Sequence, residues 1–281
     1  MKLWYRLHRW HPALRWPLKL FAFLLVTALV LYPKVWLLPT WVSRLADMNQ
    51  TIDPNDPGLE PLAQAVRART ASTDSRELLP TVQQVVHERI PYAWDWDVWG
   101  VVDYLPTTAE VLAAGREDCD GRAVLAAAVL RRLGCEAWLV SDLKHVWVAT
   151  PAGEIMGPGT GEKTMEGGEA GTRFKLSLGT VSNLVRGITF GVAVFPLTRE
   201  LLILIALCGL TIGPSCSTRR AVVGCLLLVF ALALLRDAQP SAGGLAQHEH
   251  LVWGGWGLAA IGWLVLAFRG AGCRSPAGRP Q

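Results

Sequence analysis

A cysteine and a histidine, 26 residues apart, are the residues of this sequence best suited to covalent chemistry. Cys119 opens the run CDGRAVLAAAVLRRLG, which favours a helix that ends at Gly134. A thiol at a helix N-terminus lies near unpaired N–H groups and the positive end of the helix dipole, and both favour the thiolate. His145 opens the alternating run HVWVAT, which favours a strand. This is the arrangement of a thiol nucleophile and its general base.

The two residues can meet only if the helix packs on a sheet that carries the histidine. The sequence predicts strands at 136–141, 145–150 and 154–157, a glycine-rich flexible loop at 157–171, and an edge strand at 173–178. Amphipathic helices are predicted at 59–70 and 75–90, and a capped short helix runs from about Thr107 to Ala114. We therefore expect an α+β domain in which a helix at 120–133 packs on an antiparallel sheet.

The same residues carry a resemblance to a known family. The runs AEVLAAGREDCDGRAVLAAAVLRRLG and HVWV resemble the core of the transglutaminase-like superfamily, the papain-like Cys-His-Asp group. The run VWGVVDYLPTTAEVL is similar to the matching part of bacterial transglutaminase-like cysteine proteinases. The resemblance covers residues 80–160, and it implies a transglutaminase-like fold with Cys119 as the nucleophile and His145 as the base.

One position departs from the family pattern. The acid that orients the histidine normally precedes a proline on the next strand, but this strand reads Glu154-Ile155-Met156-Gly157-Pro158, so Gly157 stands where Asp is expected. Neutralising such an acid costs a serine-protease triad orders of magnitude in turnover. Glu154 and Glu162 are nearby acids, but neither lies at the matching position.

Other candidate site residues surround the cysteine. In animal transglutaminases a tryptophan N–H faces an oxyanion; here Trp94, Trp96 and Trp99 are equal candidates, and they could instead be buried aromatics that pin a loop. Asp118 and Asp120 flank the thiol. The resemblance implies calcium binding for such acids, whereas local chemistry favours carboxylates that cap the helix. They would also raise the pKa of the thiol by charge repulsion, against the helix dipole.

No cofactor is predicted. His248-Glu249-His250 offers two imidazoles but no third ligand, which is weak support for a metal site. Cys119 and Cys135 lie at the two ends of one predicted helix, about 22 Å apart at 1.5 Å per residue. A disulfide needs Cα atoms within about 7 Å, so we expect Cys119 to be a free thiol.

The charge distribution indicates a membrane protein. Residues 40–180 carry 13 Lys and Arg against 20 Asp and Glu, while the rest of the chain carries 14 basic and 3 acidic residues. This basicity flanks apolar runs, so it indicates membrane orientation and no nucleic-acid partner. The apolar run at 18–38 follows a basic N-terminus without a small-x-small cleavage site, which favours an uncleaved signal anchor over a signal peptide.

A count of four membrane spans agrees with the positions of the basic residues in the loops. The spans are predicted in the 18–38 run and at 196–212, 221–235 and 251–268, with Arg199 and Glu200 in the headgroups and an interfacial helix at 182–194. The positive-inside rule then places both termini in the cytoplasm. The predicted domains are a basic N-terminus with its anchor at 1–39, an extracytoplasmic transglutaminase-like domain at 40–180, and an interfacial helix, three spans and a cytoplasmic tail at 181–281.

Two functions follow as alternatives. One is a thiol hydrolase or acyl transferase, anchored in the lipid bilayer of the cell membrane, that acts on amide bonds of an extracytoplasmic peptide or protein. The other is a catalytically inactive transglutaminase-like module that serves binding or assembly at the membrane.

Overall fold

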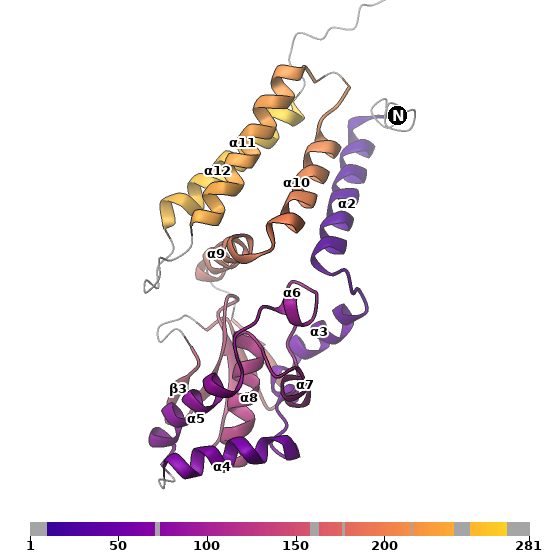
Figure 1. Ribbon diagram of the computed structural model, residues 1–281. Coiled ribbons are helices and arrows are strands. Elements are labelled where there is room, and N and C mark those ends of the chain that lie inside the picture. Colours follow the sequence, from indigo (N-terminus) through magenta and orange to yellow (C-terminus); the bar gives the residue numbers. More distant parts are fainter. Residues whose placement is uncertain are drawn as a thin grey trace, which may run out of the picture. The chain divides into compact units, whose positions relative to one another are not determined.

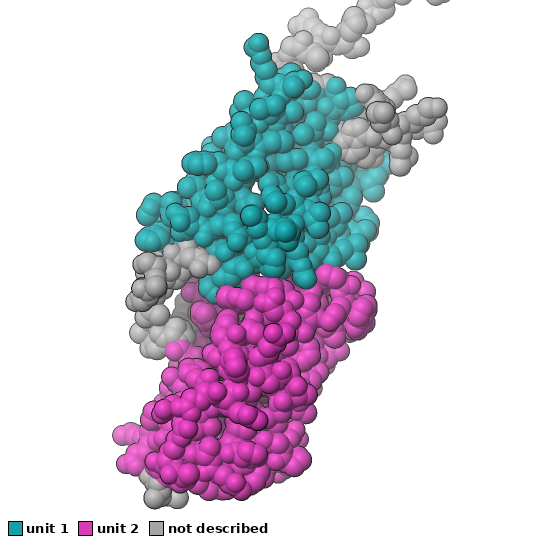
Figure 2. All heavy atoms as spheres, viewed as in Figure 1, with its two compact units in different colours: residues 1–31, 188–281 teal, residues 32–187 magenta. Residues whose placement is uncertain are grey.

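The computed structural model describes residues 10–70, 74–157, 163–175, 178–214, 216–238 and 248–268. The chain divides into two compact units (Figure 2). Met1–Leu31 and Ile188–Gln281 form what we call the helical unit, and Tyr32–Gly187 forms the α+β unit. Cys119 and His145 both belong to the α+β unit, which contains the range 40–180 predicted as the extracytoplasmic domain.

A five-stranded antiparallel sheet forms one layer of the α+β unit. Its strands lie in the order β3-β2-β1-β4-β5. They are β1 (Trp138–Ser141), β2 (Val146–Thr150), β3 (Gly153–Ile155), β4 (Met165–Gly168) and β5 (Gly171–Phe174). The predicted mixture of helices with an antiparallel sheet is confirmed, and the last strand lies at an edge as expected.

Strand β4 corrects the prediction of a flexible loop at 157–171. Its residues pair with β1 on one side and with β5 on the other. A Cβ atom at Gly167 would lie 2.7 Å from Asn49 Oδ1, so glycine is needed there for close packing. The glycines that suggested a loop therefore include one that lets another side chain approach a strand.

Helix α8 (Cys119–Arg132) forms the centre of the α+β unit (Figure 1). It contacts β1 and β2 of the sheet and the helices α4, α5 and α7. Every residue from Ala123 to Leu130 is 0% exposed, because an apolar helix without a polar face must be covered all round. The helix is followed by Gly134 at φ +86°, the left-handed conformation expected after a helix end.

The remaining helices of the α+β unit are mostly short. They are α3 (Leu37–Ala46), η1 (Met48–Thr51), η2 (Pro57–Leu59), α4 (Glu60–Arg69), α5 (Ser75–Arg89), α6 (Asp95–Val98) and α7 (Thr108–Ala114). The predicted cap of α7 is confirmed as a capping box, in which Thr107 Oγ1 accepts from the N–H of Glu110 and the Glu110 carboxylate accepts from the N–H of Thr107. Gly115 ends α7 at φ +68°.

The helical unit contains helices of membrane-spanning length. α2 (Pro12–Leu31), α11 (Thr218–Asp237) and α12 (Glu249–Ala267) are each long and apolar enough to span a membrane. α9 (Leu178–Val194) and α10 (Leu197–Thr211) meet at an angle of 115° and together give a fourth candidate. Three to four apolar helices therefore support a membrane protein, as the sequence indicates.

The first span differs from its expected position. The first span is predicted in the apolar run 18–38, but α2 begins at Pro12 and ends at Leu31, and α3 begins separately at Leu37. Proline disfavours helical geometry in the preceding residue, which explains the break. Helix α3 ends at Ala46, within the range 40–180 that was predicted as the extracytoplasmic domain.

Helices α11 and α12 pack closely through glycines. A Cβ atom at Gly224 would lie 2.5 Å from Leu266 Cδ2, and one at Gly255 would lie 2.7 Å from Leu235 Cδ2. Small residues that allow such approach are typical of helix pairs in membranes.

Glu200, which was expected in the headgroup region, is only 7% exposed. Arg236 near the end of α11 pairs with it and also donates to the Phe195 carbonyl at 2.9 Å. The ion pair therefore links the start of α10 to the end of α11.

Candidate active site around Cys119

Cys119 is the first residue of α8, as predicted. The preceding residue, Asp118, caps the helix through a hydrogen bond from the N–H of Asp120 at 3.0 Å. The Cys119 thiol donates to Asp120 Oδ1 at 3.2 Å, and the backbone of Val146 lies close enough to the thiol to lower its pKa. Cys119 is a free, partly exposed thiol, which confirms the expectation of no disulfide.

His145 lies in the turn between β1 and β2, one residue before β2 begins at Val146. The Asp142 carboxylate accepts from the N–H groups of Lys144 and His145, each at 2.9 Å, and Leu143 takes a positive φ of 75°. An aspartate that bonds backbone groups two and three residues ahead is a standard way to hold a turn. The backbone of the residue after His145 thus touches the thiol.

The imidazole of His145 is held neutral at pH 7. Burial lowers its pKa below the ordinary value of 6.5, and the charge of Lys144 acts in the same direction. The negative charge of Asp142 opposes this shift without reversing it. A neutral imidazole is the form that accepts a proton, as a general base must.

The electrostatics of Cys119 favour the protonated thiol. Burial raises the pKa of the thiol well above its ordinary value, and the charges of Asp120 and Asp118 raise it further. The nearby backbone of Val146 lowers the pKa, but its effect is smaller than those of burial and the two acids. The balance that the sequence left open, between the helix dipole and the flanking acids, is therefore decided for a protonated thiol at neutral pH.

Five carboxyl groups gather at this end of α8. They belong to Asp95, Asp103, Glu117, Asp118 and Asp120, and each has a raised pKa whose first cause is burial. Repulsion between the carboxylates adds to the shift of Asp95, Asp118 and Asp120. Such a group of acids holds protons at a pH where isolated carboxyl groups are ionised.

Among the described residues, Asp95 is the most buried acid with a carboxylate oxygen that has no hydrogen-bond partner. It is 2% exposed, and its Oδ2 accepts from the N–H of Tyr104 at 2.6 Å. Its Oδ1 is buried with no hydrogen-bond partner among the described residues. Ligand atoms of Asp95, Glu117 and Asp118 lie within 4.8 Å of one another, as do those of Asp118, Cys119 and Asp120. These donors suit a cation that prefers oxygen, such as calcium.

His248 and His250 were the other candidate metal ligands. Their ring centroids lie 5.8 Å apart. Within the described ranges, the only two groups of potential metal ligands are those around Cys119, and neither includes these histidines.

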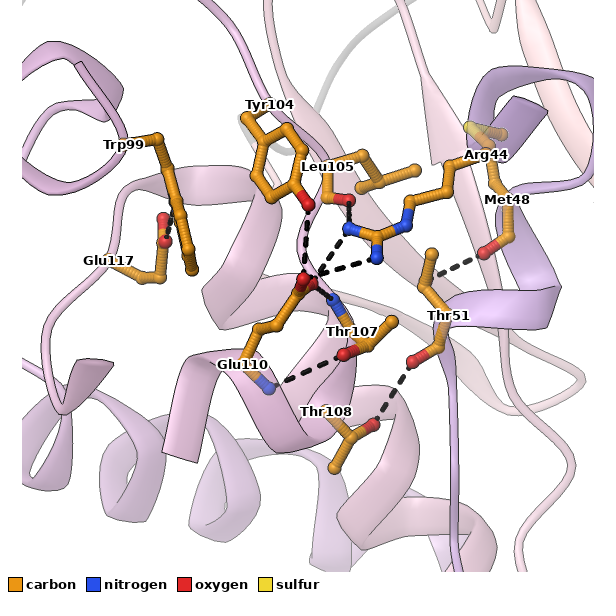
Figure 3. A network of polar contacts seen from close by, with 10 residues as sticks. All are labelled: Arg44, Met48, Thr51, Trp99, Tyr104, Leu105, Thr107, Thr108, Glu110 and Glu117. Carbon is orange, nitrogen blue, oxygen red and sulfur yellow. Dashed lines mark hydrogen bonds and ion pairs between the residues drawn. The ribbon is translucent and has the colours of Figure 1, made fainter. Parts of the chain in front are cut away.

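Glu117 is completely buried beneath the site. Its carboxylate accepts from the indole N–H of Trp99, which lies across it (Figure 3), and from the N–H of Asp118 at 3.0 Å. A Cβ atom at position 121 would lie 2.4 Å from Glu117 Cγ, which explains Gly121 in the first turn of α8. No pattern in the sequence marks this acid beyond its place beside Asp118.

A second polar network ties the segment before the cysteine to α3. The Glu110 carboxylate accepts from Arg44 Nη1 at 2.7 Å and from the Tyr104 hydroxyl at 3.0 Å (Figure 3). Arg44 also donates to the Leu105 carbonyl at 2.9 Å. The capping glutamate of α7 therefore also binds α3, which helps to fix the chain that leads into Cys119.

The candidate oxyanion tryptophans have different surroundings. Trp99 donates its N–H to Glu117, so this group is committed to a buried carboxylate. Trp94 stacks on Trp96 with ring centroids 4.8 Å apart, and Tyr92 meets Trp94 edge-on at 5.0 Å. These contacts fit the expectation of aromatics that pin a loop.

Trp147 explains the glycine at position 157. A Cβ atom at Gly157 would lie 2.7 Å from Trp147 Cγ, and Trp147 is 1% exposed. Glu154, one of the possible replacement acids, accepts from Trp147 Nε1 at 2.8 Å and pairs with Lys163 at 2.5 Å. Glu162, the other, lies outside the described residues.

A groove of the α+β unit lies away from the thiol. It has a volume of about 710 Å³ and runs between α5 and β3. His87 and Gln83 line it from the helix, and Glu154 and Ile155 line it from the strand. Neither Cys119 nor His145 is among its lining residues.

Comparisons of the chain with models of protein families, with curated protein sequences and with solved structures find no match. The class of protein is therefore defined by its own features: a mixed helix-and-sheet domain with a helix-start cysteine, attached to three or four apolar helices of the helical unit.

Proposed function

We propose that this chain is a membrane-anchored thiol hydrolase or acyl transferase that acts on amide bonds of an extracytoplasmic peptide or protein. The observation that carries the proposal is the closeness of the Val146 backbone to the Cys119 thiol, whose pKa it lowers. It supports a shared site because it puts the residue next to His145 against a thiol at a helix start. The resemblance of both motifs to the transglutaminase-like superfamily points the same way.

In this reaction the proton of Cys119 passes to His145 as the sulfur attacks the amide carbonyl. The imidazolium then gives this proton to the leaving amine, and water or another amine resolves the acyl-enzyme. The raised pKa of the thiol means that proton transfer must accompany the attack. The lowered pKa of His145 supports the role of acceptor.

The proposed location is the cell membrane, with several spans, both termini in the cytoplasm and the α+β unit outside. The apolar helices support contact with a lipid bilayer. No cofactor is required for thiol chemistry. If calcium binds, Asp95, Glu117 and Asp118 are the residues that would hold it, and its charge would oppose the repulsion that Asp118 exerts on the thiol.

The test uses the full chain in detergent with a set of fluorogenic peptide amides. Cys119→Ala and His145→Ala should each abolish amide turnover, because the first removes the nucleophile and the second its proton acceptor. Cys135→Ala and His87→Ala are matched controls in the same unit and should leave turnover unchanged. If Cys119→Ala retains the activity of the parent chain, the enzyme proposal is wrong.

A specific pair of observations favours the alternative, an inactive module for binding or assembly. The thiol is held protonated, and Trp147 fills the space next to Gly157 that an orienting acid would need. In that case the groove between α5 and β3 is the candidate binding surface. The inactive chain should show no acyl-enzyme by mass spectrometry with any peptide ester, whereas a single acylated Cys119 supports the enzyme.

A further inference from the structure

A small cavity lies at one end of the apolar helices, within the helical unit. Arg15, Trp16 and Lys19 of α2 line it, together with Thr211 at the end of α10, Arg220 at the start of α11 and Phe268 after α12. Its volume is about 30 Å³. Since one water molecule needs about 10–15 Å³ on this measure, the cavity suits a group of a few atoms.

The charged residues that are described in the cavity lining are all positive. Arg15, Lys19 and Arg220 contribute three cations, and none of the described residues that line the cavity is acidic. Arg15 and Lys19 are only 7% and 5% exposed, so their charge is held away from water. Grouping buried cations is unfavourable, and an anion in the cavity would relieve it.

Helix dipoles add to this preference for an anion. Arg15 lies in the first turn of α2 and Arg220 in the first turn of α11. The N-terminal turn carries the positive end of the dipole and normally favours Asp or Glu rather than arginine. An anion near both helix starts would gain from the dipoles as well as from the side chains.

The cationic side chains are held in place by neighbours. Arg220 Nη2 donates to the Val265 carbonyl near the end of α12 at 2.7 Å. Lys19 Nζ lies 5.2 Å from the ring centroid of Trp16, and the Arg15 guanidinium lies 5.8 Å from it. Trp16 in turn meets Trp263 edge-on at 6.1 Å. The cations are therefore ordered before any ligand arrives.

The position suits the polar boundary of a bilayer. Apolar side chains of α2 that follow these cations, including Phe21 and Leu24, are more than half exposed, as expected for a lipid-facing surface. Trp10 and Phe268 are exposed at the same helix ends, and aromatic residues are enriched at membrane interfaces. Basic pockets between membrane helices at this level bind phosphate-bearing headgroups.

We propose that this cavity binds a phosphate group, supplied by the headgroup of an anionic phospholipid or by a soluble phosphate. Arg15, Lys19 and Arg220 provide the charge, and the Thr211 hydroxyl, whose residue is 6% exposed, lies on the same lining. The site is independent of Cys119 and of the proposed reaction.

The experiment is native mass spectrometry of the full chain in a neutral detergent. Dioleoyl phosphatidylglycerol, dioleoyl phosphatidylcholine and inorganic phosphate are titrated separately against the parent chain, Lys19→Gln, Arg220→Gln and Arg219→Gln. Arg219 is the matched control, because it is exposed, lies next to Arg220 and does not line the cavity. Lys19→Arg keeps the charge, and circular dichroism spectra verify that each variant folds.

We expect tight retention of one anionic ligand and weak retention of phosphatidylcholine. Lys19→Gln and Arg220→Gln should each weaken the anionic ligand by about fivefold, the effect of one basic residue near a membrane surface. Lys19→Arg and Arg219→Gln should bind as the parent does. Phosphatidylglycerol retained more tightly than inorganic phosphate identifies a lipid site, and the reverse identifies a soluble phosphate. The proposal is overturned if the parent chain and the three glutamine variants bind the anionic ligand equally. It is also overturned if neither anion is preferred over phosphatidylcholine.

Discussion

Trp147 lies so close to Gly157 that a Cβ atom at position 157 would stand 2.7 Å from Trp147 Cγ. The tryptophan is itself fixed, because its N–H bonds to Glu154 at 2.8 Å and its side chain is buried. From the sequence alone, Gly157→Asp is expected to restore the family's acid and to raise activity, by tenfold or more if the family geometry is retained. The contact with Trp147 predicts a different result.

Gly157→Asp should lower the stability of the α+β unit, by about 1–3 kcal/mol as for other overpacked sites, and should not raise amide turnover. Gly157→Ala introduces the same Cβ without a charge, so it should lower the melting temperature by a similar amount. Ala170→Asp, on the exposed turn between β4 and β5, is the control and should melt as the parent does. A gain of turnover in Gly157→Asp would show that Trp147 can move aside and would restore the original expectation.

The raised pKa of Cys119 predicts slow alkylation at neutral pH. Only the thiolate reacts, so the rate should still be rising above pH 9, the ordinary value for a thiol. Asp120→Asn removes one source of charge repulsion, so it should speed alkylation by about tenfold, the effect of one pKa unit, at a pH where Asp120 is ionised in the parent chain. Peptide mapping after iodoacetamide treatment separates Cys119 from the other thiols. Asp97→Asn, an exposed acid of the same region, is the control; the same acceleration there would contradict the assigned cause.

The raised pKa of Glu117 predicts that the free energy of unfolding falls as the pH rises. Burial raises its pKa from 4.5 to about 7, so the folded chain favours the protonated acid. This stabilising contribution is fully present below pH 4.5, the pKa of the carboxyl group in the unfolded chain. It is lost as the pH rises through 7, and the free energy of unfolding falls by a few kcal/mol in all. Glu117→Gln cannot ionise and should show a smaller fall in melting temperature between pH 5 and pH 8.

The control for this prediction is Glu77→Gln, which changes an exposed glutamate in the first turn of α5. It should keep the full pH dependence of the parent chain. The other buried acids around Cys119 shift in the same direction, so Glu117→Gln should reduce the dependence without removing it. An unchanged pH dependence in Glu117→Gln would assign the effect to those acids alone.

The basic flanks predict that both termini lie in the cytoplasm. A reporter that is active only outside the cytoplasm should give no signal when fused after Gln281, because the tail carries basic residues that are retained inside. The same reporter inserted in the β4–β5 turn, between Glu169 and Ala170, should be active. A strong signal from the C-terminal fusion would reject the four-span topology.

The features that the sequence predicted correctly are those set by neighbouring residues. An Ala-rich run with Cys119 at its start and Gly134 after its end predicts α8 because helix propensity and termination act over a few positions. The capping box of Thr107 and Glu110 has a fixed spacing of three residues, and the apolar helices are recognised by length and composition.

The features that only the tertiary structure decided depend on residues far apart in the chain. Pairing of β4 with β1 and β5 turns an expected loop into a strand. Burial, together with acids that fold around the thiol, raises the pKa of Cys119 and so decides a direction that the sequence left open. The basic cavity joins the start of α2 to the start of α11, about two hundred residues later. No local pattern contains these neighbours, since folding alone brings them together.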